Sequence, residues 1–61
     1  MYVLRCIGNG SNDGKYVSKP SMASAYTLNI KHVRTFATIE EANNSKCGNE
    51  VVVAMSDITL D

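Results

Sequence analysis

Apolar residues gather in four short stretches of the chain, with polar, turn-forming residues between them. The first stretch, residues 2–7, is apolar except for Arg5 and contains aromatic and β-branched members. Alternate side chains of a strand point to opposite faces, so a strand here places Tyr2 and Leu4 on one face and Val3 on the other. The pattern therefore predicts a strand over residues 2–7.

A run of turn-forming residues follows this strand. Asn, Asp and Gly tolerate the positive φ that a reversing backbone needs, and they fill most of Gly8–Gly14. A β pattern resumes over residues 15–18, so the two strands are expected to form a hairpin with Gly8–Gly14 as its loop. Pro20 then ends the second strand or confines it to a sheet edge.

Residues 21–32 fit no single period, and we expect them to form an irregular connection with at most a short extended piece beginning at Tyr26. Residues 33–37 are rich in β-branched and aromatic side chains and predict a third short strand.

A helix is expected next, because Thr38 with Glu41 three residues later matches a capping box. In this motif the threonine oxygen accepts a hydrogen bond from a backbone N–H of the first turn. The helix should run from Ile39 to about Lys46, with Gly48 as the residue that ends it. It is short, so it depends on packing against the sheet.

The strongest strand pattern lies at residues 50–55, where a nearly continuous apolar run is typical of a central strand that is either covered on both faces or paired on both sides. Residues 56–61 form a tail whose alternation over 56–60 either adds a short edge strand or frays. The order of these predicted elements, β-β-β-α-β, indicates one α+β domain over residues 1–61. This domain is expected to be a small antiparallel β-sheet of about four strands with one short helix packed on one face.

Length and charge limit what such a domain can do. The chain has 61 residues, 44% of them hydrophobic, and a formal net charge of zero. One core of this size rarely supplies more than about 3–5 kcal/mol of stability, so a deep catalytic cleft is not expected. Basic residues predominate in 1–34 and acidic ones in 35–61. These charges either intermix when the halves pack or form a dipolar surface that suits association.

No motif for catalysis, a cofactor or a metal emerges from the residues. The glycines within Gly8–Gly14 follow a strand, but a second strand comes next, whereas a dinucleotide site needs a helix there. His32 is the only histidine and is far in sequence from Cys6 and Cys47, which lack the paired spacing of a zinc site. We expect no enzymatic activity, no cofactor and no metal, and two free thiols.

One set of side chains could form a binding surface. Tyrosines interleaved with basic residues can stack on bases and contact phosphate. Alternatively, Tyr2 and Tyr16 form a cross-strand pair that closes the hairpin. The candidate surface consists of Tyr2, Arg5, Lys15, Tyr16, Lys19, Tyr26, Lys31 and Arg34.

A membrane location is not expected from the sequence. No apolar run approaches the roughly 20 residues that a membrane-spanning helix needs. Arg5 interrupts the N-terminal apolar stretch, which a secretory signal would keep continuous. We therefore expect a cytoplasmic protein.

Two segments carry a resemblance to known proteins. Residues 14–17 read GKYV, and residues 34–42 match R-x-F-x-T-x-E-E-A, followed by a closing strand. This layout resembles that of very small accessory proteins of phages and prophages of Gram-positive bacteria. The resemblance implies an accessory gene product that binds and inhibits a host protein, and it assigns no catalytic or binding residue.

The sequence therefore favours a non-enzymatic phage or prophage accessory protein that acts by protein–protein binding, with inhibition of a host enzyme or defence system as its effect. The partner is a host protein or a second copy, bound at a sheet edge over residues 15–19 or 56–60. Homo-oligomers pool small cores, so oligomerisation is expected. Two alternatives stay open: a small module that binds single-stranded nucleic acid through the tyrosine and basic set, and a structural component of the virion.

Overall fold

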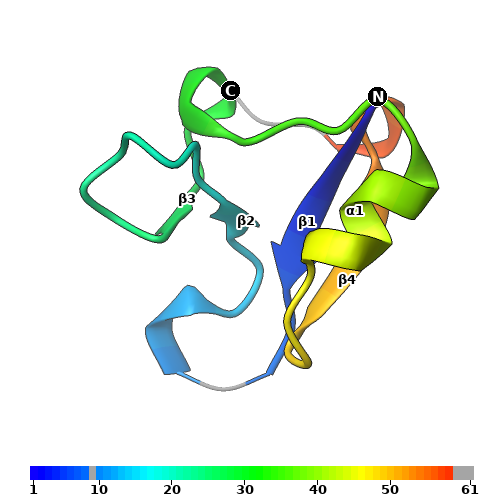
Figure 1. Cartoon of the computed structure of the whole chain (residues 1–61). Coiled ribbons are helices and arrows are strands. Elements are labelled where there is room, and N and C mark those ends of the chain that lie inside the picture. The colour runs from blue at the N-terminus through cyan, green and yellow to red at the C-terminus, as the bar shows by residue number, and fades with distance from the viewer. Residues whose placement is uncertain (9, 59–61) are drawn as a thin grey trace.

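The computed structural model describes residues 1–8 and 10–58 (Figure 1). It contains the strands β1 (Tyr2–Cys6), β2 (Tyr16–Val17), β3 (Tyr26–Thr27) and β4 (Glu50–Ala54), and the helix α1 (Ile39–Ser45). Short 3₁₀ turns lie at Gly10–Asn12, Ile30–His32 and Met55–Asp57.

The strands form one sheet in the order β3-β2-β1-β4, and every neighbouring pair is antiparallel. Figure 1 shows α1 lying across β1 and β4, on one face of this sheet. The predicted α+β fold, a small antiparallel sheet with one short helix, is confirmed.

The third strand is not where the sequence predicted it. Residues 33–37 form only single bridges, from Val33 to Ser18 and from Phe36 to Tyr2. The segment pairs at one residue with the end of β2 and at another with the start of β1. Because it pairs with two different strands at one residue each, it does not form a strand of the sheet. The strand that completes the sheet is β3, which is the short extended piece expected to begin at Tyr26 within the otherwise irregular stretch.

Of the two interpretations of the valine run, covered faces fit the structure and pairing on both sides does not. The valine-rich strand β4 lies at one end of the strand order and pairs only with β1, whereas β1 has neighbours on both sides. The valine side chains pack on both faces of the sheet: Val52 packs on the core of the helix side and Val53 on the core of the opposite side. A continuous apolar run thus indicates burial of both faces and says nothing about pairing of both edges.

The two predicted edges need correction as well. β2, within residues 15–19, is flanked by β1 and β3 and is therefore internal. After β4 the chain enters the 3₁₀ turn Met55–Asp57, and Ile58 belongs to no strand. The rest of the tail predicted to form an edge strand, residues 59–61, lies outside the described residues.

The sheet separates two small groups of buried side chains. On the helix side, Leu4 and Phe36 pack with Ala42 of α1. On the opposite side, Val3 packs with Tyr16 and Val33. Adjacent residues of β1 feed the two groups because strand side chains alternate between faces. β1 is thus the element on which both halves of the interior depend.

The start of α1 follows the predicted cap, and its end does not follow the predicted stop. The Thr38 hydroxyl oxygen accepts the backbone N–H of Glu41 at 3.1 Å. The helix ends at Ser45, and Lys46 leaves it in an extended conformation with φ −75°. Gly48 is not among the glycines with positive φ, so it does not act as the left-handed terminating residue.

Replacing the cap should weaken the fold measurably. We expect Thr38→Ala to lower the free energy of unfolding by about 1 kcal/mol, because a first-turn N–H loses its acceptor. Urea unfolding followed by circular dichroism measures this, with Thr38→Ser, which keeps the oxygen, as the matched control. Equal losses in the two variants would contradict the capping role.

Candidate protein-binding edge

The predicted surface residues do not gather on one side of the sheet. Arg5 and Tyr16 are opposite each other on β1 and β2 and share the face away from α1. Tyr26 is opposite Val17, which packs on the helix-side core, and Tyr2 packs there too. The suggested Tyr2–Tyr16 cross-strand pair is wrong, because Tyr16 faces Arg5. The three tyrosines therefore do not form one stacking surface.

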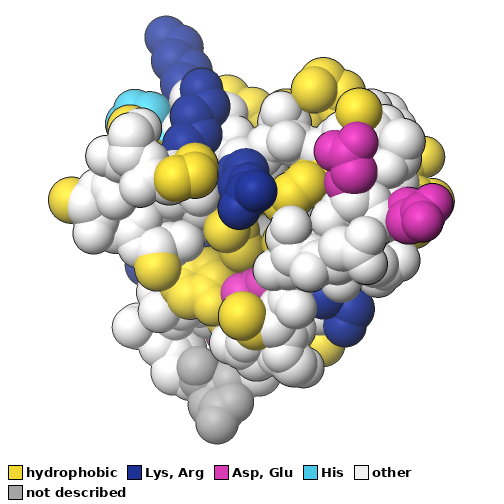
Figure 2. Space-filling model, in the orientation of Figure 1, with side chains coloured by type: hydrophobic (Ala, Val, Ile, Leu, Met, Phe, Trp, Pro, Cys, Tyr) yellow, Lys and Arg dark blue, Asp and Glu magenta, His cyan; other side chains and the backbone are white. Residues whose placement is uncertain are grey.

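The basic residues of the candidate surface differ in their exposure and contacts. Lys19 and Lys31 are exposed, whereas Lys15 and Arg34 are half-buried. The Arg34 guanidinium lies over the ring of Phe36, 4.7 Å from its centroid, and so covers a core side chain. In Figure 2 basic side chains lie at the upper left, near the centre and at the lower right, and acidic ones lie mainly on the right, over α1.

The register of β4 is set by backbone hydrogen bonds beyond each of its ends. The N–H of Ile7 donates to the carbonyl of Asn49 at 2.8 Å. At the other end, the N–H of Met55 donates to the carbonyl of Met1 at 2.8 Å. Between them the pairing of β1 with β4 is continuous and contains no bulge.

This register decides which backbone groups of β4 point outward. In an antiparallel pair, residues that exchange hydrogen bonds alternate with residues that do not. Counting from the two end bonds, Val51 and Val53 exchange bonds with β1, and Val52 and Ala54 do not. The N–H and C=O groups of Val52 and Ala54 therefore face away from β1, and we call them the open edge of β4.

The open edge lacks the features that usually protect a strand end of a sheet. No described residue pairs with β4 on that side. Native edge strands are commonly blunted by lysine, proline, bulges or short length. β4 is five residues long, reads EVVVA and contains none of the first three. Its backbone is thus available as a template for another strand.

Glu50 anchors the start of β4 from inside the protein. Its side chain is only 5% exposed. One carboxylate oxygen accepts the Tyr26 hydroxyl at 2.7 Å, and the other accepts the backbone N–H of Cys47 at 2.9 Å. The bond to the carboxylate favours the protonated phenol and raises the pKa of Tyr26 above 10.0. These contacts tie β3 to the first residue of the edge strand.

Sequence reasoning missed this carboxylate as a structural residue. Glu50 stands directly before a valine run, a position that gives no signal of burial, because glutamate is almost never buried unless it is paired. Its partner, 24 positions away in the chain, could not be found from local pattern.

The two cysteines have different surroundings. Cys6 is buried and Cys47 exposed, and each is a free thiol. The Asn49 side-chain amide lies 3.6 Å from the Cys6 sulfur. Across residues 1–8 and 10–58 there is no group of three His, Cys, Asp or Glu side chains placed to hold a metal ion. The helices of this part of the chain are all too short or too polar to cross a bilayer.

Comparisons with protein-family models, curated proteins and solved structures gave no match to this chain. Among the described residues, β4 is an edge strand whose outward backbone groups at Val52 and Ala54 face away from β1.

Proposed function

We propose that this chain is a non-enzymatic accessory protein of a phage or prophage that binds a host protein and inhibits it. The contact is the open edge of β4, to which the partner adds an extended strand. The resemblance in residues 14–17 and 34–42 supports the phage origin. The outward backbone groups of Val52 and Ala54 are the observation that supports the mode of binding.

Strand addition suits this edge physically. A partner strand satisfies the outward N–H and C=O groups, and each net hydrogen bond contributes about 0.5–1.5 kcal/mol. The side chains of Val51 to Ala54 are half-buried, so their remaining apolar surface can be covered by the neighbouring strand. The edge carries no exposed charge, which favours a partner segment that is apolar and β-branched.

Ala54→Pro is the variant that tests this mode of binding. Ala54 has φ −67° and ψ 134°, a conformation that proline adopts without strain. Its N–H faces outward, so the ring removes a donor of the open edge without removing a bond to β1. We expect capture of the host protein from a lysate to fall about tenfold, with the circular dichroism spectrum unchanged.

The matched control is Ala54→Gly, which shortens the side chain and keeps the N–H. It should capture the same protein as the unsubstituted chain. If Ala54→Pro captures that protein equally well, the edge is not the binding site. If instead the unsubstituted chain sediments as a dimer and Ala54→Pro as a monomer, a second copy occupies the edge and the host-strand proposal is wrong.

A further inference from the structure

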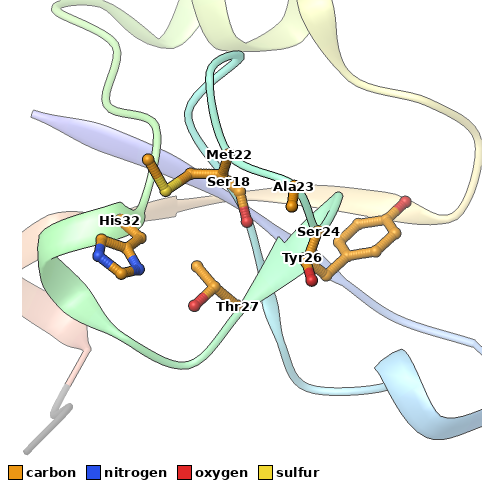
Figure 3. A pocket seen from close by; sticks show the side chains of 7 residues that line it. All are labelled: Ser18, Met22, Ala23, Ser24, Tyr26, Thr27 and His32. Carbon is orange, nitrogen blue, oxygen red and sulfur yellow. The ribbon is translucent and has the colours of Figure 1, made fainter.

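A second feature lies beyond β2, on the side of the sheet away from β4. A cavity of about 260 Å³ opens between the end of β2, the connection that follows it, β3 and the 3₁₀ turn Ile30–His32. Figure 3 shows the side chains that line it, among them Ser18, Thr27 and His32. The cavity shares no residue with the open edge of β4.

Ser18 lines this cavity and carries a buried hydroxyl. Its side chain is 5% exposed, and its Oγ has no hydrogen-bond partner among the described residues. The backbone around it is held firmly, because its N–H donates to the carbonyl of Ala25 at 2.9 Å. Buried hydroxyls are almost always hydrogen-bonded, so this one indicates a partner that the fold itself does not supply.

Two other donors line the same cavity. Thr27 Oγ1 accepts the N–H of Asn29 at 3.0 Å, which leaves its own hydroxyl hydrogen free to donate. His32 is placed by its backbone, whose N–H donates to the carbonyl of Asn29 at 2.9 Å, and its exposed imidazole can donate an N–H. Figure 3 shows the His32 ring across the hollow from Ser18.

Among the described residues, the lining of the cavity contains no carboxylate that would repel an anion. Tyr26 also lines the cavity, but its hydroxyl is turned to the carboxylate of Glu50. Lys19 and Lys31 are exposed and adjoin lining residues in the chain. In Figure 2 the histidine lies beside basic side chains.

The apolar residues that line the cavity, together with its volume, limit the size and polarity of a ligand. Met22 and Ala23 contribute a thioether and a methyl group to the lining. The volume of about 260 Å³ is smaller than the usual range of ligand sites, about 300–1,000 Å³. A compact molecule with one polar and one apolar end fits this combination.

We propose that this cavity binds a small oxyanion, a carboxylate or phosphate group carried on a short apolar body. Ser18, Thr27 and His32 donate hydrogen bonds to the anionic oxygens, and Met22 and Ala23 contact the apolar part. The proposal stands independently of strand binding at β4.

Titration of the ¹⁵N-labelled chain with butyrate, and separately with methyl phosphate, tests this site by NMR, with sodium chloride at equal ionic strength as the reference. We expect saturable shifts of the amides of Ser18, Thr27 and His32 with at least one probe. Saturation by butyrate alone identifies a carboxylate site, and saturation by methyl phosphate alone identifies a phosphate site.

Three variants give the test its specificity. Ser18→Ala should bind the probe about tenfold more weakly, because a hydrogen bond to a charged group is lost. The fold should be retained, since the hydroxyl has no protein partner to lose. His32→Ala, at an exposed position, should also weaken binding, whereas Ser21→Ala, outside the cavity, should not. Absence of saturation with both probes, or equal affinity in Ser18→Ala and the unsubstituted chain, would overturn the proposal.

Discussion

Leu4→Ala is expected to remove most of the stability of the protein at room temperature. Leu4 is 1% exposed and packs between β1 and α1, against Phe36 and Ala42. Truncating a buried leucine costs about 2–5 kcal/mol. A core of this size supplies only about 3–5 kcal/mol in total. One substitution in the central strand therefore removes most of the stability.

Urea unfolding followed by far-ultraviolet circular dichroism measures this effect. Leu28→Ala is the matched control, because Leu28 is 54% exposed and surface truncations change stability by about 0.5 kcal/mol or less. Similar unfolding curves for the two variants would show that Leu4 does not lie in the interior described above.

The second large effect is expected at Glu50. In Glu50→Ala, the Tyr26 hydroxyl and the Cys47 N–H lose their acceptor in a partly buried site. We expect a loss of about 2–3 kcal/mol in the free energy of unfolding, because both groups are left unpaired. Glu50→Gln keeps an amide oxygen as acceptor and should lose less. Glu40→Ala, at an exposed helix position, is the control and should change stability by less than about 1 kcal/mol.

The same contact predicts a pH dependence. The pKa of Tyr26 in the folded protein lies above its ordinary value of 10.0, so the folded state holds this proton more tightly than the unfolded chain. The resulting stabilisation is complete below about pH 10 and is lost as the pH rises through the raised pKa. Titration of the Tyr26 ring signals by NMR should show ionisation at lower pH in Glu50→Gln. An unchanged titration would mean that Glu50 does not control Tyr26.

The features that sequence predicts well are local ones. The cap at Thr38 needs only Glu41 three residues away, and α1 follows from that spacing. The loop between β1 and β2 contains Gly8, Gly10 and Gly14, which all have positive φ. Interactions of this kind are set by a few neighbouring residues, so one sequence is enough to infer them.

The order of strands and the location of the edge depend on distant pairings. β3 has two residues, too few for a period, and exists because it pairs with β2. Val33 and Phe36 look like parts of one strand, yet their partners belong to two different strands. The open edge of β4 follows from the position of that strand in the sheet, which no local pattern in its valines encodes.

The predicted binding residues were incomplete for the same reason. Tyr16 and Tyr26 were identified from composition as surface groups, whereas tertiary contacts bury the first and tie the second to Glu50. The open edge consists of backbone groups at Val52 and Ala54, so no side-chain motif can reveal it.

Amide hydrogen exchange along β4, measured by NMR in dilute solution, tests the open edge most directly. The register predicts slow exchange at Val51, Val53 and Met55, whose N–H groups face β1, and fast exchange at Val52 and Ala54. Fast exchange at Val52 and Ala54 should become slow when a partner strand is bound. Uniform protection of all five amides in the free, dilute protein would contradict an edge that is available for binding.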